Sequence, residues 1–190
     1  QLRTHLLILD APPNTHPGLQ EHLEAIQALT EEAIQATRTL TVELSPPVLQ
    51  REGLSAAFRW LADHMAEMHT LDVDLEIQDD CQSYNSELSV LLFQAARELL
   101  FNVVKHAGIK RAQLSLQEKD DMVIVCVLDY GIGFDTANRD RPRRKIIGFG
   151  LASIEERLNL FGGQVALTSQ PGKGTSVTLT VPKVLKFWTE

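Results

Sequence analysis

Apolar and small residues recur in steps of four and three along the first part of the chain. Over residues 1–45 the pattern is typical of helix, and Pro12 and Pro13 separate a shorter segment from a longer one. The longer segment has a heptad seam at Leu19, Leu23, Ile26, Thr30, Ala33, Thr37, Leu40 and Leu44. We therefore expect a helical hairpin that forms a homodimer as a four-helix bundle. A hairpin folded onto its own domain is the alternative.

A break follows the hairpin, and the helical pattern then resumes. Residues 46–53 begin with two prolines and contain a glycine near their end, which predicts a linker. Apolar residues lie on one face from Leu54 to Met68 and again from Ser86 to Ala107, and a shorter helical pattern runs from Gly150 to Leu160. These three segments predict the helices of a second domain.

Strict alternation of apolar and polar residues marks the strands of this domain. The alternating segments are residues 71–78, 112–118, 122–129, 164–170 and 175–182. Short turns join the second segment to the third and the fourth to the fifth, which predicts two hairpins. We expect an α+β fold over residues 54–182, a two-layer α/β sandwich whose mixed sheet is covered by helices on one face. Residues 183–190 form a tail beyond the last strand.

The net charge of −7 argues against a nucleic-acid-binding protein. No apolar run approaches the roughly 20 residues of a membrane-spanning helix, and the cysteines and histidines show neither a disulfide framework nor zinc-ligand spacing. Basic residues are nevertheless concentrated between residues 139 and 145. This local cluster suggests an anionic ligand, and a solvated surface segment is the alternative.

The second of the three predicted helices carries polar residues among apolar ones. Glu98 and Asn102 are four residues apart and Lys105 is three further on, so the three share one helix face. Asparagine offers an uncharged oxygen to Mg²⁺, lysine offers a cation to phosphate, and glutamate can orient or deprotonate a nucleophile. A simply solvated helix face is the alternative.

A carboxylate followed by two glycines ends the third predicted strand. Asp129 can accept a hydrogen bond from an exocyclic amine such as the N6 group of adenine. Gly131 and Gly133 permit positive φ and a close backbone approach to a flat ligand. An ordinary turn is the alternative, but the long basic segment that follows is not a return strand.

A second glycine pair, Gly148 and Gly150, precedes Leu151 where a helix pattern starts. Free N–H groups at a helix start favour anions, and glycines let a phosphate approach. The spacing is neither a Rossmann fingerprint nor a Walker sequence. Thr175, at the start of the last strand, carries a hydroxyl that could contact the same ligand, and a plain turn is the alternative.

Together these segments resemble the ATP-binding domain of two-component sensor histidine kinases, which has the Bergerat or GHKL fold. ELLFNVVKHA resembles the N box, DYGIGF the first glycine box, GFGL the second, and GTSVTLTVP the closing strand. The four elements occur in the family's order within the span from Leu54 to Val181. The hairpin followed by LSPPVLQREGLSAAF is similar to the subgroup paired with helix-turn-helix response regulators.

The resemblance implies transfer of the γ-phosphoryl group of ATP to a histidine, with relay to a response-regulator receiver domain. It implies that Asn102 chelates Mg²⁺, that Asp129 binds adenine, and that Glu98 is a polarising base. Lys105 or His106 would contact phosphate.

The resemblance also implies roles for the glycines. Gly131, Gly133, Gly148 and Gly150 would frame the pocket and a lid of residues 135–147. Leu151 and Thr175 would complete the cofactor-binding set. The phospho-accepting histidine is expected upstream of residue 1, because His5 is followed by leucine rather than by an acid. A cytoplasmic kinase is expected, with any membrane attachment through upstream segments.

Three other interpretations are open. An anti-sigma-type serine kinase has the same fold, but the heptad hairpin and the Pro-Pro turn argue against it. A non-catalytic nucleotide-binding dimerisation module on the same fold would be expected to have a degenerate pocket. All the pocket residues are present here, which argues against it. A clamp-type ATPase of the chaperone or topoisomerase kind is disfavoured by the size of the chain.

Overall fold

The computed structural model describes residues 22, 25–31, 45–78, 84–136 and 143–183, with only the backbone for 143–149. Contacts divide the chain into two compact units, residues 1–44 and 45–190. In the first unit, residues 25–31 are helical, and Ile26 and Leu29 are exposed large apolar residues. Most of the predicted heptad seam lies outside the described residues.

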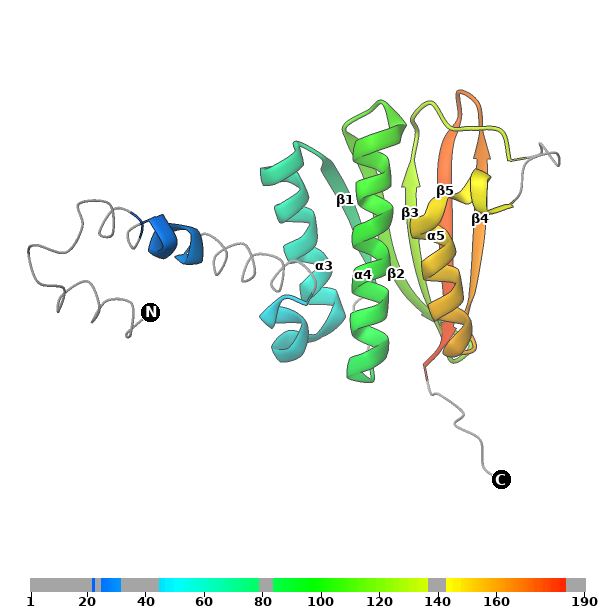
Figure 1. Ribbon diagram of the computed structural model, residues 1–190. Helices are drawn as coiled ribbons and strands as arrows, with labels where there is room; N and C mark the ends of the chain where they lie inside the picture. The colour runs from blue at the N-terminus through cyan, green and yellow to red at the C-terminus, as the bar shows by residue number, and fades with distance from the viewer. Residues whose placement is uncertain (1–21, 23–24, 32–44, 79–83, 137–142, 184–190) are drawn as a thin grey trace, which may run out of the picture. The chain divides into compact units, whose positions relative to one another are not determined.

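The second unit is built on a five-stranded sheet with the order β1-β2-β3-β5-β4 (Figure 1). The strands are β1 Asp72–Ile77, β2 Arg111–Lys119, β3 Met122–Asp129, β4 Gln164–Gln170 and β5 Gly174–Pro182. β1 is parallel to β2, and the remaining pairs are antiparallel, so the predicted mixed sheet is confirmed. Asp120 and Asp121 both have positive φ in the β2–β3 hairpin, as a tight two-residue turn requires.

Three helices lie over one face of this sheet, which completes the predicted two-layer α+β sandwich (Figure 1). They are α3 Pro47–His69, α4 Ser86–Asn102 and α5 Arg143–Leu160. α4 continues into a single π-helical segment, η1 Val103–Ala107. The helix expected from Ser86 to Ala107 is therefore an α-helix whose last residues adopt a wider turn. Among the helices described, none is long and apolar enough to cross a membrane.

The predicted linker over residues 46–53 is wrong. α3 begins at Pro47, and a proline is tolerated there because the first helical N–H has no intrahelical acceptor. Gly53, with φ of 84°, kinks the helix, and Leu49 on the first part is only 4% exposed. Residues 32–44 lie outside the described part of the chain, so the expected break after Leu44 stays a prediction. Burial of Leu49 makes residues 47–53 part of the second unit.

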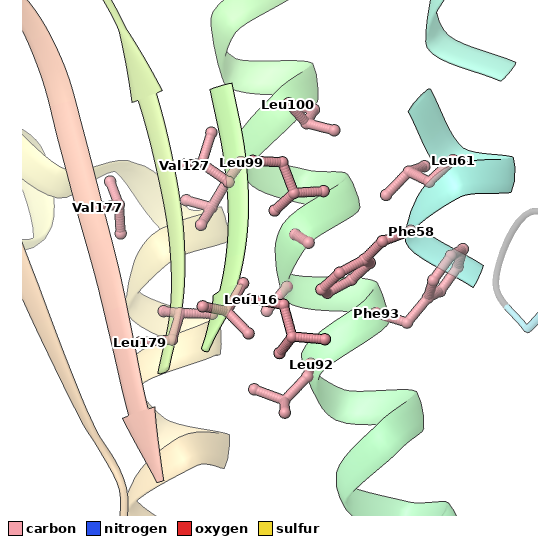
Figure 2. Packing of buried hydrophobic residues seen from close by; sticks show 14 of the residues in the cluster. Phe58, Leu61, Leu92, Phe93, Leu99, Leu100, Leu116, Val127, Val177 and Leu179 are labelled. Carbon is pink, nitrogen blue, oxygen red and sulfur yellow. The ribbon is translucent and has the colours of Figure 1, made fainter. Parts of the chain in front are cut away.

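The core lies between the helices and the inward-facing residues of the sheet. Figure 2 shows Phe58 and Leu61 of α3 packing toward Leu92 and Phe93 of α4, with Leu116 of β2 on the side of the sheet. On β3, alternate residues are buried up to Asp129 at its end, as a half-covered strand requires. The apolar contacts between α4 and β3 therefore fix the position of Asp129 beneath the helix layer.

Replacement of Phe58 by alanine tests this packing. Phe58 is fully buried, so Phe58→Ala is expected to lower the free energy of unfolding by about 3 to 5 kcal/mol, measured by urea denaturation. Leu160→Ala is the control, since Leu160 is 84% exposed and its loss should change stability by less than about 0.5 kcal/mol. Equal effects from the two variants would contradict the described core.

Candidate functional site

Asp129 is a buried carboxylate at the end of β3. It is 5% exposed, and its Oδ1 accepts a hydrogen bond of 2.8 Å from the backbone N–H of Gly131. This bond closes a short turn and holds the carboxylate in one orientation. Across the sheet, Asp129 is paired with Thr175 of β5, and Thr175 is paired with Ser169 of β4. Directly opposite residues have side chains on the same face, so the three form one polar row.

The loop after Asp129 has two glycines because protein backbone lies against them. A Cβ at Gly131 would overlap the carbonyl oxygen of Ala107, at the end of η1. A Cβ at Gly133 would overlap the carbonyl oxygens of Gln170 and Gly174, which flank the β4–β5 turn. The sequence predicted that these glycines permit close approach to a ligand. In the structure, these glycines permit close approach of three backbone segments, namely the loop after Asp129, the end of η1 and the β4–β5 turn.

Backbone hydrogen bonds of Ile132 join the same segments. Its N–H donates to the carbonyl of Ala107 at 2.8 Å, and its carbonyl accepts from the N–H of Gly172 at 2.7 Å. The glycines on either side of Ile132 are less exposed than the three large side chains Tyr130, Ile132 and Phe134. The loop is thus fixed on two sides while its apolar side chains remain at the surface.

The polar face of α4 approaches α5. Glu98 and Asn102 are half-buried, one turn apart, and the carboxylate of Glu98 lies where a Cβ on Gly150 would be. One turn earlier, Gln94 accepts a hydrogen bond of 2.8 Å from Arg157 of α5. The structure therefore places Gly150 directly against Glu98, and the sequence predicts both residues to belong to the site.

Lys105 and His106 are both exposed on η1. The ammonium group of Lys105 is 5.6 Å from the centre of the Phe101 ring, which His69 of α3 contacts edge-on at 4.9 Å. Lys105 thus extends toward the α3 side of α4 and not toward Gly150. Of the two residues offered as phosphate contacts, only Lys105 has this aromatic contact.

The expectation that the second glycine pair opens a helix is wrong. Gly148 and Gly150 both lie inside α5, which begins at Arg143. A glycine costs a helix interior only about 1 kcal/mol, and the space beside Glu98 leaves no room for a side chain at residue 150. Leu151 is 5% exposed in the apolar core, and its expected place among the cofactor-binding residues stays a prediction.

The predicted lid over residues 135–147 is described only at its ends. Thr136 donates a hydrogen bond of 3.3 Å to the carbonyl of Ser169, and the backbone of residues 143–147 belongs to α5. Residues 137–142 lie outside the described residues.

Ser169 is a residue of this site that the sequence prediction missed. It is 3% exposed and bonds to Phe134, Gly174 and Thr175. A signal was available, because Ser169 continues the inward-facing set of β4 begun by Val165 and Leu167. A hydroxyl at an inward strand position requires hydrogen-bond partners, which points to a polar cluster.

The residues present fit a nucleotide and a magnesium ion. The polar row supplies acceptors for a base, and α4 supplies the side-chain oxygens of Asn102 and Glu98 about one helical turn away from each other. Within the described ranges, no three His, Cys, Asp or Glu side chains converge as a metal cage. Mg²⁺ is typically held by one or two protein ligands together with phosphates and water, so it does not need such a cage.

Known proteins resemble this chain over most of its length. It is 33% identical over 164 residues to the oxygen sensor histidine kinase NreB of Staphylococcus carnosus, covering 86% of this chain and 46% of that protein. It is 31% identical over 163 residues to a sensor-like histidine kinase of Chloroflexus aurantiacus, covering 84% of this chain and 27% of that protein. The chain therefore spans about half and about a quarter of the lengths of these relatives.

The fold has counterparts among solved structures. The histidine kinase domain of a blue-light activated histidine kinase from Erythrobacter litoralis superimposes with a TM-score of 0.61, over 96% of both chains. Because the identity is only 16%, this likeness shows the fold alone. The family described as histidine kinase-, DNA gyrase B-, and HSP90-like ATPase matches residues 87–185, which is more than half of the chain and runs from the second residue of α4 past the end of β5. The chain thus belongs to the family of histidine kinase-, DNA gyrase B- and HSP90-like ATPases.

Proposed function

We propose that this chain is the ATP-binding catalytic part of a sensor histidine kinase. It transfers the γ-phosphoryl group of ATP to a histidine, for relay to an aspartate of a response-regulator receiver domain. The observation that carries the proposal is the buried Asp129 carboxylate, which bonds to Gly131 in a loop held between the end of η1 and the β4–β5 turn. Family membership and the names of both curated relatives support it.

Asp129 recognises the base in this proposal. One carboxylate oxygen accepts from Gly131, and among the described residues the carboxylate accepts no other hydrogen bond. The second oxygen accepts from the exocyclic amine of adenine. A buried carboxylate without a ligand partner carries a desolvation cost, which a bound amine offsets.

The polar face of α4 handles the phosphate end. Asn102 supplies an oxygen to Mg²⁺, which neutralises charge on the phosphates when it is bound. His106 is exposed on the wide turn of η1, directly before Ala107, whose carbonyl bonds to the loop that carries Gly131 and Gly133. It therefore takes precedence over Lys105 as the phosphate contact.

Glu98 acts on the attacking histidine. Phosphoryl transfer needs little covalent chemistry from the protein, so positioning and charge stabilisation dominate. A half-buried carboxylate one turn from the metal ligand is suited to orient and polarise an imidazole. Gly150 leaves space for this carboxylate, and a side chain there would displace it.

Substitution of Asp129 tests base recognition. Asp129→Asn presents an amide N–H₂ to the adenine amine, so Mg-ATP affinity is expected to fall roughly 10- to 100-fold in calorimetry. Asp121→Asn is the matched control, because it makes the same change in the β2–β3 turn, where positive φ suits asparagine. Unchanged affinity in a folded Asp129→Asn variant would exclude the assigned pocket.

Substitution of Glu98 separates binding from transfer. Glu98→Gln keeps the shape of the side chain, so Mg-ATP affinity should stay within about twofold. Acid-labile phosphorylation of a histidine-bearing dimerisation hairpin supplied with the chain should slow by about 10² to 10⁴. Glu76→Gln, on the exposed side of β1, should leave both quantities unchanged. A transfer rate unaffected by Glu98→Gln would remove the base role.

A homodimer through the N-terminal hairpin is part of this proposal. Ile26 lies on the heptad seam and is exposed in the single chain, as a residue awaiting a partner helix would be. Ile26→Asp is expected to weaken dimerisation at least tenfold in light scattering across a concentration series. Ala28→Asp adds the same charge off the seam and should have little effect. A wild-type chain that stays monomeric at high concentration would contradict the dimer.

A further inference from the structure

Ser169 uses the full hydrogen-bonding capacity of its hydroxyl. The Oγ donates to the carbonyl of Gly174 at 2.9 Å and accepts from the N–H of Phe134 at 2.9 Å. Its third contact is with the hydroxyl of Thr175 at 3.0 Å. A serine hydroxyl has one donor and two acceptor positions, so these three contacts saturate it.

The direction of the Ser169–Thr175 bond follows from this saturation. A carbonyl can only accept, so the single proton of Ser169 is committed to Gly174. Thr175 must therefore donate its own proton to Ser169. The proton assignment comes from the network of heavy atoms. As a result, the Thr175 hydroxyl has only acceptor positions left.

Two acceptors then stand side by side at this end of the sheet. Asp129 and Thr175 are directly paired across β3 and β5, with side chains on the face toward the helices. The carboxylate of Asp129 has no proton to donate when ionised, and the adjacent N–H of Gly131 is already bonded to it. The polar row therefore offers acceptors and no side-chain donor.

We infer that Ser169 is a specificity-determining positioning residue for the nucleobase. Because Ser169 accepts the proton of Thr175, the Thr175 hydroxyl can only accept a hydrogen bond from the base. The pocket therefore selects a base with an amino group over a base with a carbonyl at the same position. An amino group can donate to both acceptors, whereas a carbonyl would face two oxygens. This inference rests on the proposed binding of ATP at Asp129, and it assigns a role to a residue that touches no ligand itself.

A second role of Ser169 must be separated from this one. Its bond from Phe134 anchors the glycine loop to β4. Loss of anchoring would weaken binding of any nucleotide equally, whereas loss of the proton direction would change selectivity. The comparison of two nucleotides that differ only in the base separates the two roles.

The test compares ATP with inosine triphosphate, which replaces the amino group with a carbonyl. Affinities of the wild type, Ser169→Ala, Thr175→Val and the double variant are measured by calorimetry with Mg²⁺. We expect the preference for ATP to fall about tenfold in each single variant, as loss of one buried hydrogen bond implies. The double variant should show no further fall, because Ser169 acts through Thr175.

Ser89→Ala is the matched control, since Ser89 is a similarly buried serine on α4, at 6% exposed. It should leave the preference unchanged. If Ser169→Ala does not fold, Ser169→Cys keeps a somewhat larger side chain with a weaker donor at this position and carries the same prediction.

An equal loss of affinity for both nucleotides, or an additional fall in the double variant, would overturn the inference while leaving the proposed function standing. A wild-type chain that binds ATP and the inosine nucleotide equally well would also overturn it. A folded wild-type chain that binds neither would instead overturn the proposed function.

Discussion

The site depends on a close approach between backbone segments that only glycine allows. At Gly131 the loop after β3 lies against the carbonyl of Ala107, and at Gly133 it lies against carbonyls beside the β4–β5 turn. Ile132 bonds to both sides. A Cβ at either glycine would push the loop off one support, and Asp129 would lose the orientation that its bond to Gly131 provides. The position of the carboxylate therefore follows from backbone contacts between elements that are far apart in the sequence.

The two halves of the site come from different parts of the fold, and α4 connects them. Its apolar face packs on the sheet, its polar face carries Glu98 and Asn102, and its end widens into η1 at Ala107. π-helical turns occur often at functional sites, because they shift the helix register and redirect side chains. Here the last residue of the π-helical segment, Ala107, accepts a hydrogen bond from Ile132 in the loop between Gly131 and Gly133. The same helix thus fixes the loop proposed to bind the base and carries the residues proposed to act on the phosphates.

Sequence patterns predicted most of the sheet, the helices over it and the placement of Asp129, because alternation and amphipathicity report directly on which face is buried. They failed where a residue's role depends on a distant contact. Gly150 is expected from the sequence to start a helix, but it lies within α5, where the carboxylate of Glu98 occupies the space that a side chain would need. Leu49 was assigned to a linker, but it fills the core. Ser169 was overlooked because its three partners come together only when the glycine loop, β4 and β5 assemble.

The most direct measurement is a crystal structure of the chain with Mg²⁺ and a non-hydrolysable ATP analogue. We expect the adenine amino nitrogen within about 3 Å of the Asp129 carboxylate, and the metal ion against the side-chain oxygen of Asn102. The bonds of Ile132 to Ala107 and Gly172 should persist in the complex. A nucleotide bound elsewhere on the chain, with Asp129 still bonded to Gly131 alone, would contradict base recognition by Asp129.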